Sequence, residues 1–172
     1  KIRSFIKLSH GLRQRRAQGK KSEGEYNLEL TRLFLETLGA KFVPKESTIT
    51  LPVVEQAKGE AVKALSRIGI ESGHTYWIAH PGMGGSALNM SPAAYVQLLS
   101  ELEKTQQGTL VLTLGPAKAD LELVEAIVDT RADWRVLSRV SLSALAEVFR
   151  SASLVVAPST GPLHLAHYVG AP

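Results

Sequence analysis

Three neighbouring residues, Ser159, Thr160 and Gly161, are the part of this chain best suited to holding an anion. They follow an apolar run at 153–156 and precede a helical pattern that Pro162 opens. A strand, a short hydroxyl-bearing turn and a helix N-terminus together supply hydroxyls, backbone N–H groups and a partial positive charge. This order of residues predicts a site for an anionic, nucleotide-linked ligand. Ordinary N-capping by Ser159 or Thr160 is the alternative, and the two interpretations are compatible.

His164 lies in the first turn of the same predicted helix, where its imidazole can reach the same ligand. A histidine at a helix start is more often structural, and that interpretation stays open. His167 follows three residues later, on a neighbouring face. The pair is no metal signature, because no carboxylate or third ligand has suitable spacing, so we predict no metal site.

A glycine-rich loop at 80–90 is the second candidate, because it follows an earlier apolar strand. Gly84 and Gly85 let the backbone approach a ligand closely, and Ser86 adds a hydroxyl. The loop is not a P-loop, since no Gly-Lys-Ser/Thr follows, and it is not Gly-x-Gly-x-x-Gly. A glycine-rich surface turn is the alternative interpretation of the same residues.

No catalytic constellation is visible in the sequence. It contains no Gly-x-Ser-x-Gly elbow and no acidic pair spaced for glycoside hydrolysis. The chain has no cysteine, which excludes disulfides, Cys-ligated zinc and thiol catalysis. We therefore interpret the C-terminal part as a binding half without its own general base.

Alternating strands and helices must position the two loops. The predicted strands are 76–79, 109–114, 134–137 and 154–156. The helices between and after them are predicted at 91–104, at 119–128, at 141–150 and from Pro162 onward. This alternation predicts an α/β fold with a Rossmann-like parallel sheet, right-handed crossovers and helices on both faces. Ligands of such sheets bind outside the carboxyl ends of the strands, where both loops lie.

The N-terminal part has a different character. We predict helices at 25–38, with a broad leucine-rich stripe, and at 55–68, ended by Gly39 and Gly69. The segment at 40–54 is predicted to be irregular or a short strand. The chain ends at 170–172, where another strand usually follows, so we expect a truncated chain.

Charge is distributed unevenly along the 172 residues, whose net charge is +4. Eight of the 20 basic residues and none of the 16 acidic ones lie in residues 1–21. This arm is either solvated or attracted to phosphate on a lipid headgroup, a glycolipid or a nucleic acid. We see no nucleic-acid-binding motif and predict no nucleic-acid partner. No apolar run approaches the roughly 18 residues of a membrane span.

Three segments of the chain resemble glycosyltransferase family 9, the ADP-heptose:lipopolysaccharide heptosyltransferases. HPGMGGSALNM at 80–90 resembles the family's HPGSGGSAKNW segment, and SRVSLSALA at 138–146 resembles its TSLxELA turn and helix. Residues 155–172 are similar to VSNDTGPMHLAAALGTP. Order and spacing match over residues 75–172.

The resemblance implies a GT-B architecture, in which two Rossmann-like domains face a cleft. Residues 1–54 would be a basic arm and helix from the end of the N-terminal domain. Residues 55–172 would be the nucleotide-sugar-binding domain, incomplete at its C-terminus. The implied reaction is inverting transfer of heptose, or a related sugar, from an ADP-sugar to a lipopolysaccharide core acceptor, with no metal or further cofactor.

The same resemblance implies partners, location and site residues. The partners are a nucleotide-sugar donor, a phosphorylated glycolipid acceptor and, peripherally, an anionic membrane; the location is the cytoplasm or the inner membrane face. The residues implied to contact the diphosphate are Ser159, Thr160, Gly161 and His164. Those implied to line the phosphate and sugar side are Gly84, Gly85 and Ser86, and the nucleoside pocket is assigned to Val140 and Gly115.

Three departures from the family pattern bear on function. An aspartate that can contact the donor sugar is Ser159 here, and a lysine that balances the diphosphate is Leu88. The family's catalytic base lies near the start of the N-terminal domain, and this chain contains no such region, so the catalytic residue is unknown. We expect the 172 residues alone to bind donor and hardly turn over.

Two further functions remain open from the sequence. One is a non-catalytic nucleotide- or phosphate-binding module, either a fragment or a degenerate relative. The basic arm is also compatible with a lipid-surface adaptor. A dehydrogenase is disfavoured, because the glycine fingerprint and its distal acid are absent.

Overall fold

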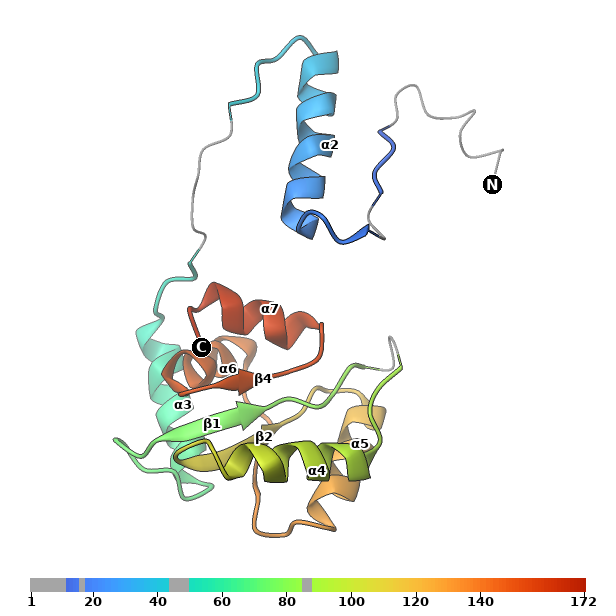
Figure 1. Ribbon diagram of the computed structural model, residues 1–172. Helices are drawn as coiled ribbons and strands as arrows, with labels where there is room; N and C mark the ends of the chain where they lie inside the picture. Colours follow the sequence, from blue (N-terminus) through green and yellow to red (C-terminus); the bar gives the residue numbers. More distant parts are fainter. Residues whose placement is uncertain (1–11, 16–17, 44–49, 85–87) are drawn as a thin grey trace. The chain divides into compact units, whose positions relative to one another are not determined.

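The computed structural model describes residues 12–15, 18–43, 50–84 and 88–172 (Figure 1). The chain divides into two compact units, Lys1–Thr48 and Ile49–Pro172. Within the described ranges, no helix combines the length and apolar character needed to cross a bilayer.

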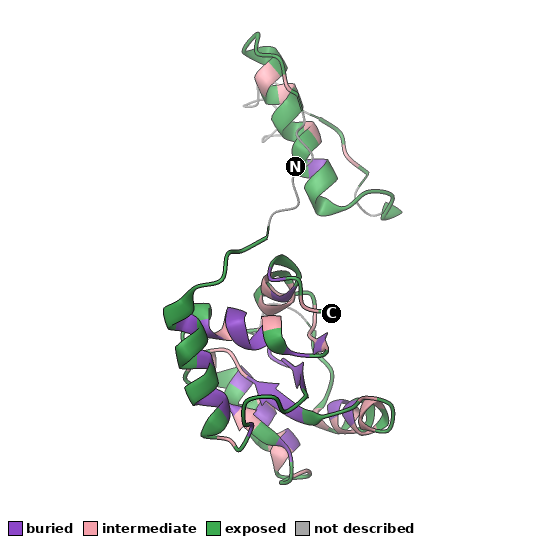
Figure 2. Cartoon of the chain, turned by 90° about the vertical axis from the view of Figure 1, so that its left-hand side faces the viewer, coloured by how far each residue is buried: buried purple, intermediate pink, exposed green. Residues whose placement is uncertain are grey.

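The first unit contains helix α2, Glu23–Thr37. Ser22 starts it with a capping box, in which its Oγ accepts from Glu25 N–H while the Glu25 carboxylate accepts from Ser22 N–H. Gly39, with a φ of 73°, follows the helix end, as predicted. Of the described residues in this unit only Tyr26 is buried, and most of α2 is exposed (Figure 2).

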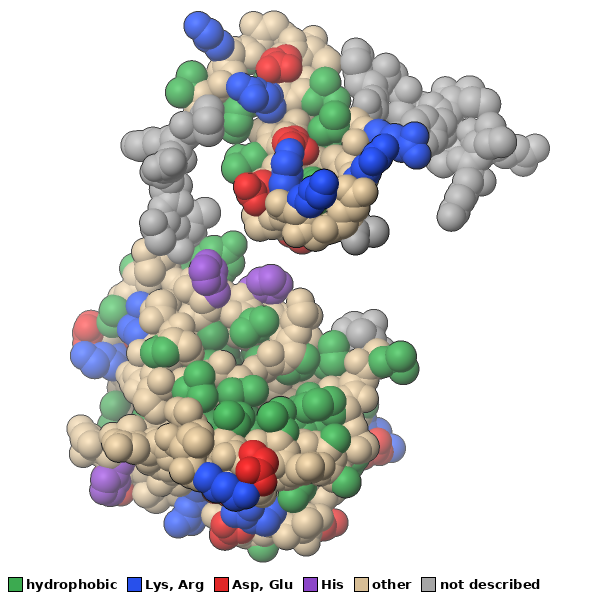
Figure 3. Space-filling model, viewed as in Figure 1, with side chains coloured by type: hydrophobic (Ala, Val, Ile, Leu, Met, Phe, Trp, Pro, Cys, Tyr) green, Lys and Arg blue, Asp and Glu red, His purple; other side chains and the backbone are tan. Residues whose placement is uncertain are grey.

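Most of the leucine-rich stripe predicted for α2 is therefore exposed among the described residues of this unit. Its exposed apolar side chains stand among basic and acidic ones on the surface (Figure 3). They include Leu28, Leu30, Phe34 and Leu38.

The second unit is built on a four-stranded parallel sheet, which confirms the predicted α/β fold. Its strands are β1 (Tyr76–Ala79), β2 (Thr109–Thr113), β3 (Arg135–Leu137) and β4 (Val155–Val156). They lie in the order β3-β2-β1-β4. The central strand β1 pairs with β2 on one side and β4 on the other, so that Ile78 aligns with both Val111 and Val155. All four residues of β1 are buried.

Helices cover both faces of this sheet, again as predicted (Figure 1). The helices among the described residues of this unit are α3 (Glu55–Ser66), α4 (Pro92–Glu103), α5 (Lys118–Val128), α6 (Leu142–Ser151) and α7 (Gly161–Tyr168). Two separate apolar cores follow from this layering. Helices α3, α6 and α7 supply one core, and α4 and α5 supply the other.

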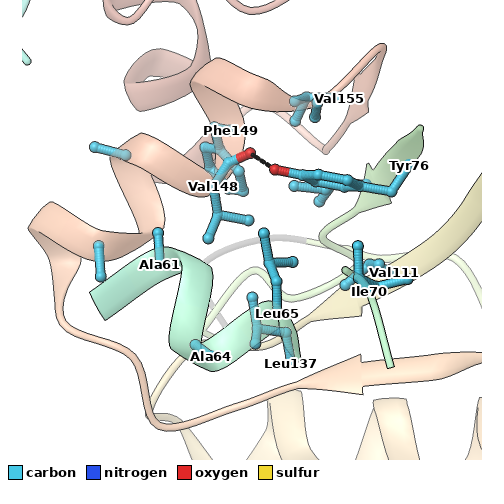
Figure 4. Close-up of a cluster of buried hydrophobic side chains, with 14 of the residues drawn as sticks. Ala61, Ala64, Leu65, Ile70, Tyr76, Val111, Leu137, Val148, Phe149 and Val155 are labelled. Carbon is cyan, nitrogen blue, oxygen red and sulfur yellow. Dashed lines mark hydrogen bonds between the residues drawn. The ribbon is translucent and has the colours of Figure 1, made fainter. Parts of the chain in front are cut away.

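Alternation along β1 divides its side chains between the two cores. Tyr76 and Ile78 belong to the core that α3 and α6 line. Figure 4 shows Tyr76 in this core together with Leu65 and Phe149. The Tyr76 hydroxyl donates to the carbonyl of Val148 at 2.7 Å, and burial raises the pKa of Tyr76 to about 12. Trp77 and Ala79 belong to the opposite core, which also contains Leu99, Leu112 and Ile127.

Two serines start helices of the second unit, as predicted. The Ser91 Oγ accepts from Ala94 N–H at 3.2 Å, and the Ser141 Oγ accepts from Ala144 N–H at 3.1 Å. These caps fix where α4 and α6 begin, and therefore where the preceding loops end.

The segment before α3, residues 51–54, is bound by hydrogen bonds to α6 and α7. Leu51 N–H donates to the Tyr168 carbonyl at 2.8 Å, and the Arg150 guanidinium donates to the Leu51 carbonyl at 2.8 Å. Val54 N–H, at the start of α3, donates to the buried Glu147 carboxylate at 3.3 Å. These contacts hold residues 51–54 firmly to the α/β unit.

Candidate functional site

The loops that follow all four strands line one cavity of about 1350 Å³. His80 and Gly82–Gly84 follow β1, Leu114–Lys118 follow β2, Ser138–Val140 follow β3, and Ser159–Pro162 follow β4. The chain moves outward from β1 to β3 and then returns to place β4 on the other side of β1. Parallel sheets bind ligands at the carboxyl ends of strands where the order reverses in this way. The cavity lies at that point.

Thr160 occupies the N-cap position of α7 but does not cap the helix. Its hydroxyl donates backward to the Pro158 carbonyl at 3.2 Å. The expected capping by Thr160 with Pro162 at the first helical position is therefore not what the structure shows, because Gly161 takes that position. The usual side-chain acceptor is missing, which leaves the first turn of α7 suited to an anion in the cavity.

The predicted diphosphate residues Ser159, Thr160 and Gly161 all line the cavity. Gly161 has ample space around it, because a Cβ added there would meet no atom within 4 Å, and its φ is not in the left-handed region. Neither its backbone conformation nor its neighbours require a glycine. A close approach by a ligand is a remaining reason for glycine at this position.

His164 lies elsewhere on α7. Pro162 and Leu165, three residues apart, face the cavity, whereas His164 is exposed and is not among the lining residues. Histidine side chains are visible on the surface over α7 (Figure 3). The structure thus does not bring His164 together with Ser159–Gly161, and its contact with a diphosphate stays a prediction.

The first glycine loop contributes Gly84, which has a φ of 57° and lines the cavity. Gly85 and Ser86 lie outside the described residues. Leu88, which stands where a lysine is common, is fully exposed. At the start of the loop His80 is buried, with its Nδ1 2.9 Å from the Thr113 hydroxyl, and burial lowers the pKa of His80.

A buried aspartate in this site was missed by the sequence reasoning. Asp120 is only 5% exposed, and its Oδ1 accepts from Met83 N–H at 3.0 Å and from Gly84 N–H at 2.9 Å. Its only sequence signal is an acid in the first turn of a helix, which is common because it complements the helix dipole. Its partners lie 36 and 37 residues away, where no local pattern reaches.

The wall beneath the β2 and β3 loops is mostly apolar. Gly115 and Val140, assigned to a nucleoside pocket, both line it. The aliphatic side chains around them are Leu114, Leu121, Leu142 and Leu145. Two cations also line the cavity, Lys118 at the start of α5 and Arg139, whose φ of 56° is unusual for a residue other than glycine. The cavity combines an apolar wall, hydroxyls, a helix N-terminus and positive charge.

Comparisons with known proteins bear on the family and the fold of this chain. The model for Glycosyltransferase family 9 (heptosyltransferase) matches residues 43–172. A curated Haemophilus influenzae protein named "Putative glycosyltransferase" is 32% identical over 162 residues, which is 93% of this chain and 46% of that protein. The chain thus spans just under half the length of this relative.

Two solved structures share the fold at 18% sequence identity. One is a family 9 glycosyl transferase from Veillonella parvula, with a TM-score of 0.67 over 84% of this chain and 41% of that one. The other is the E. coli heptosyltransferase WaaC with ADP-2-deoxy-2-fluoro heptose, with a TM-score of 0.56 over 88% of this chain and 44% of that one.

Proposed function

Because the chain belongs to glycosyltransferase family 9, we propose that its α/β unit binds the nucleotide-sugar donor in the cavity at the carboxyl ends of the strands. The observation that carries this proposal is the first turn of α7. It faces the cavity, follows β4 beside the strand-order reversal, and receives no cap from Thr160.

The two ends of the cavity suit the two ends of a nucleoside diphosphate. The hydroxyls of Ser159 and Thr160 and the N-terminus of α7 favour the diphosphate. The apolar wall around Val140 and Leu145 favours a nucleobase, for which we propose adenine. Lys118 and Arg139 line the same cavity and supply positive charge that Leu88 does not.

The proposed reaction is inverting sugar transfer, with heptose or a related sugar as the group transferred. An acceptor hydroxyl forms the new bond to the anomeric carbon from the face opposite the diphosphate. The bond between that carbon and the diphosphate oxygen breaks, and ADP leaves with its electron pair. The α7 N-terminus stabilises the charge that develops on the leaving diphosphate.

The proton of the acceptor hydroxyl passes to a general base, which we place in a part of the enzyme outside these 172 residues. We propose a phosphorylated glycolipid of the lipopolysaccharide core as the acceptor. In the described part of the first unit, Arg13, Arg15 and Lys20 line a groove of about 510 Å³, and we propose that they bind the acceptor phosphate. Two further cations of this groove, Lys21 and Arg32, pair with the carboxylates of Glu29 and Glu36. On this account the chain alone binds donor with little turnover.

Isothermal calorimetry with ADP and with ADP-heptose tests the donor site. We expect the chain to bind both. We expect Thr160→Val to weaken binding about fivefold to twentyfold, because on this proposal the Thr160 hydroxyl turns from the Pro158 carbonyl to a phosphate oxygen when the donor binds. Thr105→Val is the matched control, because Thr105 is exposed beyond the end of α4 and its hydroxyl donates only to the Leu102 carbonyl. Absence of binding by any nucleotide or nucleotide sugar would overturn the proposal.

A non-catalytic nucleotide- or phosphate-binding module is the second candidate, favoured by Ser159 in place of the family's aspartate. The two functions differ in one measurement. Release of ADP from ADP-heptose in the presence of lipopolysaccharide core acceptor, by a protein that joins this chain to an N-terminal domain of the family, supports the transferase. Donor binding without any such release supports the binding module.

A further inference from the structure

We infer that Asp120 is a positioning residue, whose carboxylate holds the first glycine loop against the start of α5 and for which Gly82 and Gly115 leave room. This inference rests on the proposed donor site, because the loop that Asp120 holds forms one wall of that cavity. Nothing in the family resemblance assigns this role to Asp120.

The hydrogen bonds show what the carboxylate holds. A single oxygen, Oδ1, accepts from two consecutive loop amides, Met83 N–H at 3.0 Å and Gly84 N–H at 2.9 Å. Both donors follow β1, whereas Asp120 lies in the first turn of α5, after β2. The side chain therefore ties together the loops at the ends of two neighbouring strands.

The two glycines beside the carboxylate have a steric reason to be glycine. A Cβ at Gly82 would lie 2.5 Å from the Asp120 Cγ, and a Cβ at Gly115 would lie 2.5 Å from its Oδ2. Neither glycine has a φ in the left-handed region, so backbone conformation does not require them. Space for the Asp120 side chain is the reason that the structure supplies.

The surroundings of Asp120 compensate for the burial of a carboxylate. Two N–H groups donate to it, and the N-terminus of α5 places a partial positive charge beside it. The N-cap of this helix, Ala117, has no side chain that caps it. The buried carboxylate of Asp120 therefore balances the partial positive charge at the N-terminus of α5.

This arrangement changes the role expected of the first loop. The sequence predicted that glycines in this loop let the backbone approach a ligand closely, but the Met83 and Gly84 amides already donate to Asp120. The described part of the loop therefore shapes the cavity, while the N-terminus of α7 remains for the diphosphate. Asp120 acts on the ligand through the loop.

The test combines three variants in two assays. Asp120→Ala removes the acceptor, Asp120→Asn keeps one oxygen in place, and Gly82→Ala adds the colliding methyl group. Calorimetry with ADP measures binding, amide hydrogen exchange followed by NMR reports on Met83 and Gly84, and thermal unfolding verifies folding. Gly59→Ala in α3 is the control, since a Cβ there meets nothing within 4 Å.

We expect Asp120→Ala and Gly82→Ala each to weaken ADP binding by about tenfold or more, and Asp120→Asn to restore part of the loss. Gly82→Ala should add little in the Asp120→Ala background, because the atoms it would meet are gone. The Met83 and Gly84 amides should exchange faster in Asp120→Ala, with or without ADP. Gly59→Ala should leave binding and exchange unchanged.

Two results would overturn the inference: independent, multiplicative effects of Gly82→Ala and Asp120→Ala, or unchanged exchange of both loop amides in folded Asp120→Ala. If the wild-type chain binds no nucleotide, the donor site itself fails. The exchange and unfolding measurements on the same variants then still decide whether Asp120 holds the loop.

Discussion

Thr160 occupies the N-cap position of α7, but its hydroxyl does not cap the helix. In α4 and α6 a serine at the same position bonds to the helix it precedes, whereas the Thr160 hydroxyl donates to Pro158. A fold without a ligand at this end gains from a cap, because capping contributes about 1 kcal/mol. The missing cap is thus a local loss of stability at the place where we propose that the diphosphate binds.

Replacing Thr160 by a residue that caps helices well tests whether stability at this position is lost in favour of ligand binding. We expect Thr160→Asp to stabilise the protein by about 0.5–1 kcal/mol in urea unfolding, because its carboxylate accepts from the α7 amides. The same variant should lose measurable binding of ADP, since a fixed negative charge then occupies the anion site. Unchanged affinity for ADP would place the diphosphate elsewhere.

His80 predicts a pH dependence of stability. Burial lowers the pKa of His80 in the folded state, although the charge of Asp120 acts in the opposite direction. The folded protein therefore holds His80 neutral at a pH where the unfolded chain, with a pKa of about 6.5, already binds a proton. The free energy of unfolding should fall as the pH drops below about 6.5, until the pH reaches the folded-state pKa.

Urea unfolding at pH 7.5 and 5.5 measures this effect. We expect the difference between the two pH values to shrink in His80→Gln. The exposed His164 is the matched control, and His164→Gln should keep the wild-type difference. An equal difference in wild type and His80→Gln would contradict the assignment to His80.

At the scale of elements, a polar cluster joins α4 to the turn before β3. The Arg131 guanidinium pairs with Glu103 at 2.9 Å, donates to the Ser100 hydroxyl at 2.7 Å and lies 4.4 Å from the centre of the Trp134 ring. The Trp134 indole N–H donates to the same Glu103 at 2.9 Å. This cluster links the end of α4 to the turn before β3, at the amino-terminal end of the sheet.

Removing the guanidinium should therefore cost more than removing an ordinary surface charge. We expect Arg131→Met to lower the free energy of unfolding by about 1–2 kcal/mol, because several hydrogen bonds are lost together. Lys104→Met, which breaks the exposed pair with Glu101, should cost less than about 0.5 kcal/mol. Equal effects in urea unfolding would show that the cluster adds nothing beyond a surface pair.

What the sequence predicts about these elements depends on how local the signal is. Strands β1 and β2 and helices α4 and α6 begin where predicted within two residues, because apolar runs, serine caps and glycines are local features. The Asp120 contacts to the first loop and the Arg150 contact to Leu51 join residues 36 to 99 positions apart. Such pairs cannot be predicted until the order of the strands in the sheet is known.

The site shows the same division. Ser159, Thr160, Gly161, Gly84, Gly115 and Val140 line one cavity because each follows a strand, and that rule needs only the predicted topology. The direction of the His164 side chain, by contrast, depends on how α7 is rotated about its axis. The apolar stripe of α2 was predicted from its leucines, but among the described residues of its unit most of α2 is exposed and only Tyr26 is buried.

At the scale of the whole molecule, the uneven distribution of charge predicts electrostatic binding to anionic lipid. Because eight basic residues and no acidic ones lie in residues 1–21, we propose that this arm binds anionic headgroups. Flotation with vesicles containing anionic lipid should recover the protein at low salt and lose it at about 0.3–0.5 M salt. Recovery with neutral vesicles, or no salt dependence, would contradict an electrostatic attachment.

Asp120, Gly82 and Gly115 lie on three separate stretches of the chain, yet each limits what the others can become. The aspartate must be lost before either glycine can acquire a side chain, so few orders of substitution are open to descendants of this sequence. Among related chains we expect covariation: aspartate at 120 with glycine at both other positions, and larger residues at 82 or 115 only where 120 is small. An alignment in which these positions vary independently would refute it. If the three positions do covary, they are inherited as one unit, although no two of them are neighbours in the sequence.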